Sequence, residues 1–111
     1  MRVSMCHCLA CQRRTGSTYG VQARFPRAQV KVTGEASEYV RYADEDGTER
    51  RFFFCPRCGS TVYYETDGDS DLVAIAVGAF ADPEFRAPAV SVWEARRHSW
   101  VSVPPGAERI G

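Results

Sequence analysis

Three cysteines lie within six positions near the start of the chain, in the stretch MCHCLACQRR. Residues two apart in an extended segment point to the same side, so Cys6 and Cys8 can converge on one metal ion while His7 faces away. Cys11 lies a turn later and can complete a set of three thiolate ligands. Three thiolates leave tetrahedral zinc one position short, and such an open position accepts a water or a substrate thiol.

A second cysteine pair, Cys55 and Cys58, forms C-x-x-C within FFFCPRCGS. Two thiolates at this spacing can bind one tetrahedral metal ion when the chain makes a tight turn between them. Pro56 fixes φ and pre-bends this turn, and Gly59 relieves it. A redox C-x-x-C would need a βαβ context, which the strand-rich surroundings do not offer. We therefore predict that Cys55 and Cys58 are metal ligands.

The five cysteines allow two arrangements. In the first, the triplet Cys6, Cys8 and Cys11 forms an open zinc site that performs chemistry or exchanges ligands. In the second, two or three of these cysteines join Cys55 and Cys58 in one closed all-thiolate site that only holds the fold, and the chain is a non-catalytic zinc-stapled β module that binds a partner. Residue spacing alone favours neither arrangement over the other.

Length and composition limit the other possibilities. The chain of 111 residues is expected to form one domain over 1–103, with a Pro/Gly-rich tail over 104–111. Fourteen basic and fourteen acidic residues cancel, so there is no general electrostatic case for nucleic acid or a membrane surface as partner. An odd number of cysteines and the lack of a signal-type apolar segment predict a reducing, cytoplasmic location.

Alternation of apolar and polar residues with a period of two predicts a mainly β fold. An acidic turn, DEDG, is expected to join two strands in a hairpin. Helical turns are expected only around Cys11 to Arg14 and at 81–85, where Asp82 can act as a cap. The thiols would then lie on loops between strands. The expected strands are 19–25, 28–34, 37–43, 48–54, 60–66, 72–80 and 87–95.

Four stretches, in this order, carry a resemblance to a known family: CHCLACQRRTGS, FFFCPRCGSTVYYE, VAIAVGAFADPEFRAP and SVWEARRHSWV. They resemble the glutathione-dependent formaldehyde-activating enzyme family, which also includes centromere protein V, from about Met5 to Val103. The resemblance implies a β-tent, in which zinc staples small antiparallel sheets. It also implies a carbon–sulfur lyase activity that joins glutathione and formaldehyde as S-hydroxymethylglutathione, with Cys6, Cys8 and Cys11 as ligands of the catalytic zinc.

The implied activity has a direct physical rationale. A zinc ion with an empty position coordinates a thiol and removes its proton, which gives a thiolate that can attack an aldehyde carbon at neutral pH. Glutathione carries two carboxylates, and a basic rim would hold them. Arg13 and Arg14, beside the triplet, are the candidate substrate-binding residues, with Arg96 and Arg97 as a second pair.

The sequence departs from the family at the second zinc site. In the family, the C-x-x-C supplies half of a structural site whose other half is an additional C-x-C near the N-terminus, and that pair is absent here. Three interpretations stay open: a shortened N-terminus, loss of the second metal, or a single zinc shared by Cys55, Cys58 and two cysteines of the triplet. The expectation is therefore one or two zinc ions per chain. Sheet edges left by missing strands would favour a homodimer.

Overall fold

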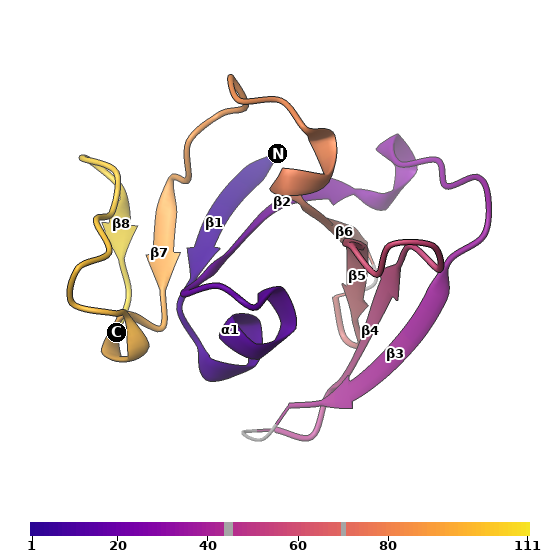
Figure 1. Cartoon of the computed structure of the whole chain (residues 1–111), viewed down its shortest axis with the longest axis horizontal. Coiled ribbons are helices and arrows are strands. Elements are labelled where there is room, and N and C mark those ends of the chain that lie inside the picture. The colour runs from indigo at the N-terminus through magenta and orange to yellow at the C-terminus, as the bar shows by residue number, and fades with distance from the viewer. Residues whose placement is uncertain (44–45, 70) are drawn as a thin grey trace.

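The fold is mainly β, as predicted. The computed structural model describes residues 1–43, 46–69 and 71–111, so Asp44 and Glu45 of the predicted DEDG turn lie outside the described residues. Eight strands join in one sheet, in the order β3-β4-β5-β6-β2-β1-β7-β8, which curves around a single α-helix (Figure 1). The strands are β1 (Arg2–Cys6), β2 (Gly20–Pro26), β3 (Ser37–Tyr42), β4 (Glu49–Phe54), β5 (Thr61–Thr66), β6 (Leu72–Ala76), β7 (Val90–Val92) and β8 (Glu108–Arg109).

The sheet is mixed. Neighbouring strands from β3 to β1 pair antiparallel, whereas β7 runs parallel to both β1 and β8. The resemblance implied several small antiparallel sheets, and the strands instead form one continuous sheet. The reason is the position of β1, which lies between β2 and β7. Because of this position, β7 and β8 extend the same sheet from β1 and do not form a second sheet. A strand that pairs parallel needs a long crossover connection. Residues 77–89 provide it by carrying the chain from the end of β6 to the start of β7.

Four predicted strands are confirmed, namely β2, β3, β4 and β5, and the predicted hairpin is confirmed by the pairing of β3 with β4. The predicted strand over 28–34 is wrong. Its first residues belong to a 3₁₀ turn (η1, Arg27–Gln29), and Val32 is exposed, because the alternation there has no sheet partner to cover it. The predicted strands over 72–80 and 87–95 are shorter than expected: each runs into a 3₁₀ turn, η2 (Val77–Phe80) and η3 (Glu94–Arg96).

Strand β1, which lies inside the sheet between β2 and β7, was not predicted. Val3 and Met5 are buried on one face, while Ser4 and Cys6 are buried on the opposite face. A strand covered on both faces usually shows a continuous apolar run. The polar Ser4 interrupts that run, which is why the sequence did not reveal the strand.

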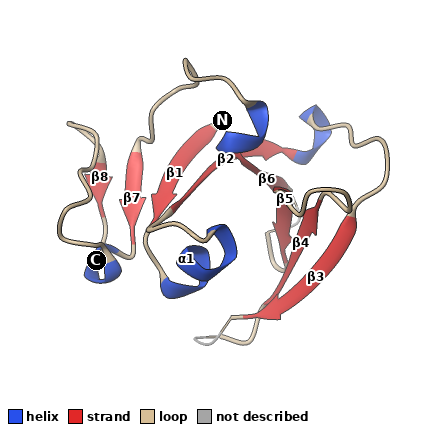
Figure 2. Cartoon of the chain, viewed as in Figure 1, coloured by secondary structure: helices blue, strands red, loops and turns tan. Residues whose placement is uncertain are grey.

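The predicted helical turns around Cys11 are confirmed as α1 (Leu9–Thr15), the one α-helix of the described residues, which lies inside the curve of the sheet (Figure 2). Cys8 is its N-cap, with Sγ accepting a hydrogen bond from the Cys11 backbone N–H at 3.3 Å. Gly16 ends the helix with a left-handed φ of 66°. Asp82 caps its predicted turn by accepting from the Glu84 N–H. No helix among the residues that the structure describes has the length and apolar character needed to cross a membrane.

Candidate metal centre

The three cysteines of the first motif converge in space. The sulfur atoms of Cys6, Cys8 and Cys11 all lie within 4.8 Å of one another. Thiolates on one tetrahedral zinc ion, with Zn–S bonds of about 2.3 Å, lie roughly 3.8 Å apart, so small adjustments would fit these donors to the ion. The donor set and its spacing therefore fit a zinc ion bound through three protein ligands.

Local structure explains this convergence. Cys6 is the last residue of β1, Cys8 is the N-cap of α1, and Cys11 lies in the first turn of that helix. The chain turns sharply between strand and helix, where the His7 N–H donates to the Val92 carbonyl at 3.1 Å. This bond fixes the turn to β7, so that the sulfurs on either side of it face the same space.

The three thiols are not equivalent. Hydrogen bonding to Cys11 and Cys8, together with burial, raises the pKa of Cys6. Hydrogen bonds from the Cys11 and Cys6 thiols and from the backbone N–H of Cys11 lower the pKa of Cys8. The two thiols therefore differ because they hydrogen-bond in opposite senses within the triplet.

Cys55 and Cys58 occupy a separate turn between β4 and β5. The Gly59 N–H donates to the Cys55 carbonyl at 2.8 Å, and Gly59 has a φ of 77°, as the predicted tight turn requires. The Cys58 thiol bonds to the Ser60 hydroxyl, and this bond lowers the pKa of Cys58. Among the described residues, neither thiol belongs to the group of ligand atoms that the triplet forms.

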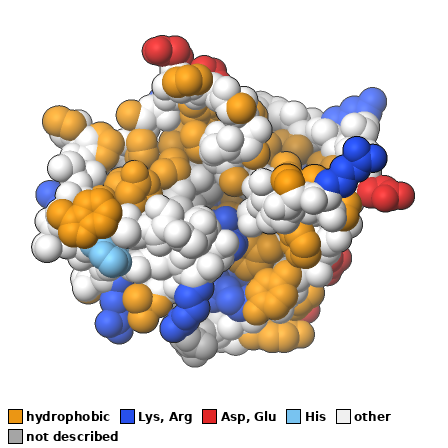
Figure 3. Space-filling view, in the orientation of Figure 1, with side chains coloured by type: hydrophobic (Ala, Val, Ile, Leu, Met, Phe, Trp, Pro, Cys, Tyr) orange, Lys and Arg blue, Asp and Glu red, His pale blue; other side chains and the backbone are white. Residues whose placement is uncertain are grey.

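A cavity of about 450 Å³ adjoins the triplet, which is within the usual size range of small-molecule sites. All three cysteines line it. The lining also includes strand residues from both sides of the sheet's centre and the first two turns of α1. Figure 3 shows this face of the molecule, with a hollow near its middle and arginine side chains close to it. The candidate metal centre is thus open to a space that could admit a ligand.

One row of side chains across the sheet forms the floor of the cavity. Residues directly opposite one another on neighbouring strands share a face of the sheet. The pairings connect, strand by strand, Arg2, Arg24, Ala74, Tyr64 and Phe52. All residues of this row except Ala74 line the cavity. The cavity is therefore a consequence of strand register.

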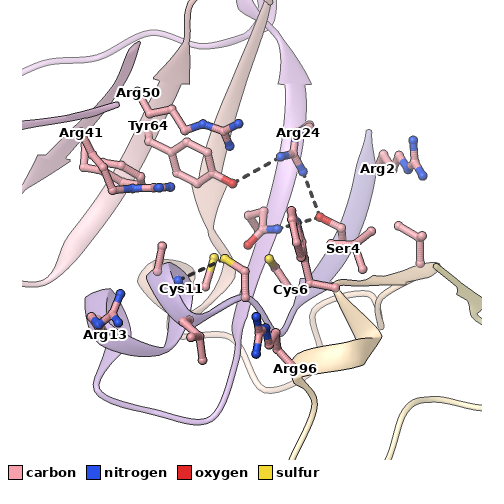
Figure 4. A pocket seen from close by; sticks show the side chains of 18 residues that line it. Arg2, Ser4, Cys6, Cys11, Arg13, Arg24, Arg41, Arg50, Tyr64 and Arg96 are labelled. Carbon is pink, nitrogen blue, oxygen red and sulfur yellow. Dashed lines mark hydrogen bonds between the residues drawn. The ribbon is translucent and has the colours of Figure 1, made fainter. Parts of the chain in front are cut away.

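A polar network lies on this floor. Arg24 donates from Nη1 to the Ser4 hydroxyl at 2.9 Å and from Nη2 to the Tyr64 hydroxyl at 3.3 Å (Figure 4). Gln22 donates from Nε2 to the same Ser4 hydroxyl at 2.8 Å. Gln22 is only 2% exposed, and its Oε1 is buried without a hydrogen-bond partner. A free acceptor thus lies in the wall of the cavity.

The structure separates the two predicted arginine pairs. Arg13 lines the cavity, whereas Arg14 stacks over the aromatic rings of Phe52 and Tyr64, at 5.4 and 5.7 Å from their centroids. Arg96 also lines the cavity, while its neighbour Arg97 pairs with Glu94 at 3.3 Å. One member of each pair therefore reaches the cavity.

Sequence reasoning missed four further arginines that line the cavity: Arg2, Arg24, Arg41 and Arg50. The four lie on four different strands, β1, β2, β3 and β4, and none belongs to the arginine pairs predicted from the sequence. The alternation of apolar and polar residues in β2 puts Gln22 and Arg24 on the polar face of that strand. This pattern was the only feature of the sequence that pointed to them. That face was expected to be solvated, and only the curvature of the sheet turns it into a cavity wall.

His7 faces away from the triplet, as predicted, and is completely buried. Its Nε2 lies 2.9 Å from the Ser91 hydroxyl, which donates to the carboxylate of Glu94. Arg97 and Arg109 donate to the same carboxylate at 3.3 and 3.0 Å. Burial lowers the pKa of His7. This network fastens the turn that carries Cys6 and Cys8 to the C-terminal part of the chain.

Comparison with known proteins agrees with this architecture. No curated protein is similar enough in sequence to be counted as a relative. The family described as "Glutathione-dependent formaldehyde-activating enzyme" matches residues 1–96, a span that contains the triplet, the Cys55–Cys58 turn and every residue of the cavity wall. The chain belongs to the glutathione-dependent formaldehyde-activating enzyme family.

Proposed function

We propose that this chain is a zinc-dependent carbon–sulfur lyase-like enzyme that makes or breaks the bond between the sulfur of glutathione and formaldehyde. The observation that carries the proposal is the position of the three thiols, which meet on the wall of a ligand-sized cavity. Family membership names the thiol and the aldehyde. Arg13 and Arg96 are proposed to bind carboxylates at the rim, and Arg14 to support the aromatic wall.

The residues around the cavity have distinct tasks in this reaction. Cys6, Cys8 and Cys11 would hold zinc, which lowers the pKa of a coordinated thiol and so supplies a thiolate at neutral pH. As the sulfur bonds to the aldehyde carbon, the aldehyde oxygen gains negative charge and then takes up the proton that the thiol lost. Arg24 and Gln22 both line the cavity, and their proposed roles are donation by Arg24 to that oxygen and acceptance of the hydroxyl hydrogen of the adduct by Gln22.

The alternative function, a closed four-cysteine module, has less support. It requires Cys55 and Cys58 to share an ion with members of the triplet, and no such grouping of ligand atoms occurs within the described residues. We keep Cys55 and Cys58 as a proposed second metal-binding pair, on the strength of their tight turn.

We also propose a reducing, cytoplasmic location for the protein, which the five free thiols support.

Titration with glutathione tests the proposal. The zinc-loaded full chain and a Cys8→Ser variant would be compared by calorimetry, with zinc content measured by atomic absorption. We expect the wild type to bind glutathione and the variant to lose both zinc at the triplet and glutathione binding. Removing zinc from the wild type with a chelator should abolish binding, and adding zinc back should restore it. Equal binding by both proteins, or by neither, would refute the open site.

A further inference from the structure

The charges that the described residues bring to the cavity are all of one sign. Of the described residues that line it, six are arginines, and none is aspartate, glutamate, lysine or histidine. The chain as a whole carries no net charge, with as many acidic as basic residues. The cavity therefore concentrates positive charge that the composition does not reveal. In Figure 4 the labelled arginines surround the cysteines: Arg2, Arg13, Arg24, Arg41, Arg50 and Arg96.

The ion pairs that the structure describes for acidic residues lie away from the cavity. Glu65 pairs with Arg27, Glu49 and Asp67 pair with Arg51, and Glu94 pairs with Arg97 and Arg109. None of these arginines lines the cavity.

By contrast, five cavity arginines have no carboxylate partner among the described residues. These are Arg2, Arg13, Arg24, Arg41 and Arg96. Guanidinium groups gathered without counter-charges repel one another, and a bound anion relieves that repulsion.

The metal would compensate only part of this charge. Zinc and three thiolates together carry one negative charge, since three negative charges meet two positive ones. Five guanidinium groups and a single negative centre still leave the cavity strongly positive. A cationic group on a ligand would find no carboxylate to pair with on the described part of the lining. Such a cavity favours dianions and disfavours an ammonium group.

We infer that the preferred substrate of this site is a thiol that carries at least two anionic groups and no ammonium group. The inference rests on the proposed function and narrows its substrate class. Glutathione meets only part of the requirement, because it has two carboxylates and also an ammonium group. A close analogue without the ammonium should fit the charges of the cavity better.

A matched pair of ligands tests the inference. Glutathione and glutaryl-cysteinyl-glycine have the same thiol and the same two carboxylates, and differ only in the ammonium group. Each would be titrated by calorimetry into the zinc-loaded full chain at 50 mM and 200 mM salt. We expect the analogue to bind at least about tenfold more tightly at the lower salt concentration, with a smaller advantage at the higher one.

Charge-removing variants locate the effect. Arg2→Gln and Arg41→Gln each remove one positive charge from the wall without touching the cysteines, and each should reduce the advantage of the analogue. Arg86→Gln is the matched control, because Arg86 is exposed and lies outside the cavity. That variant should keep the advantage of the wild type.

The outcomes separate the two proposals. If glutathione binds as tightly as the analogue, or more tightly, the inferred substrate class is wrong and the proposed thiol site stands. If the advantage is the same in Arg2→Gln, Arg41→Gln and Arg86→Gln, the cavity arginines do not cause it, and the inference is again overturned. If neither peptide binds to protein that contains zinc, the proposed function fails and the inference fails with it.

Discussion

Gln22 combines deep burial with an unused hydrogen-bond acceptor. Its side chain projects from the middle of β2 into the cavity wall, and only its Nε2 has a partner, the Ser4 hydroxyl. A buried polar atom left without a partner costs about 1 to 3 kcal/mol. Such atoms are rare in folded proteins and require an explanation. Gln22 lines the same cavity as the triplet, and we propose that a ligand of the cavity supplies the partner of Oε1.

Replacing Gln22 tests this explanation. Gln22→Met keeps the length of the side chain and removes both polar atoms, so the free energy of unfolding should change by no more than about 1 kcal/mol. The loss of one hydrogen bond to the adduct should lower kcat/KM about tenfold. Steady-state kinetics with S-hydroxymethylglutathione and thermal unfolding measure the two effects.

Gln29→Met provides the control, since Gln29 is exposed in η1. It should leave both quantities unchanged. An unaltered kcat/KM in Gln22→Met would show that Oε1 does not contact the adduct.

At the scale of elements, the metal centre depends on two short pieces of structure. Helix α1 positions Cys11 and ends at Gly16, and the loop after β7 places Glu94 against the turn between Cys6 and Cys8. Both features are local anchors for residues that would bind the ion. Each can be weakened without altering a cysteine.

The C-cap of α1 offers one such change. Gly16 has a φ of 66°, and an added Cβ would meet no atom within 4 Å, so Gly16→Ala introduces backbone strain alone. We expect a loss of about 1 kcal/mol in the free energy of unfolding, measured with urea. Gly78→Ala is the control, because Gly78 has open space around it and no positive φ. Equal stability of the two variants would contradict the assigned role of Gly16.

The Glu94 carboxylate offers the other change. The hydrogen bond from Ser91, followed by those from Arg109, lowers the pKa of Glu94 below its usual 4.5. A carboxyl group whose pKa is lower in the folded than in the unfolded state stabilises the fold at any pH above its unfolded-state pKa. This contribution is lost as the pH falls through its folded-state pKa. Glu94→Gln should therefore lower the free energy of unfolding by about 2 kcal/mol at pH 7. It should also make the decrease of this free energy below pH 4.5 less steep than in the wild type.

Urea unfolding between pH 3 and pH 7 measures this dependence. Glu84→Gln is the matched control, because Glu84 is exposed and makes no ion pair within the described part of the chain. Its pH profile should follow the wild type. A Glu94→Gln profile parallel to the wild type would mean that the carboxylate is not held in its charged form by the fold.

At the scale of the whole molecule, binding of zinc should stabilise the fold. The three ligands lie on β1 and α1 and on the turn between them, so an ion at this site binds their folded arrangement more tightly than the unfolded chain. At a free zinc concentration of about a hundredfold the dissociation constant, the gain in the free energy of unfolding is at most about 2.7 kcal/mol.

We therefore expect a chelator to lower the melting temperature by several degrees, and zinc to restore it. In Cys8→Ser the zinc-dependent shift should be much smaller. Differential scanning calorimetry on both proteins makes the comparison. A melting temperature that does not respond to zinc in the wild type would contradict binding at the triplet.

The limits of sequence reasoning also appear at this scale. The meeting of Cys6, Cys8 and Cys11 was predictable, because it depends on a turn and a helix within six residues. The row from Arg2 through Arg24 to Tyr64 was not, because it depends on the register of strands from distant parts of the chain. Alternation shows which residues share a face of a strand, but not which strands are neighbours or how a sheet curves.

The pairing of β1 with β7 has a consequence for synthesis of the chain. The triplet emerges from the ribosome roughly eighty residues before β7, which forms the wall next to Cys6. Nascent chains therefore present three close thiols to metal ions and oxidants before that wall can exist. Metal uptake by the triplet and completion of the cavity are therefore separable in time.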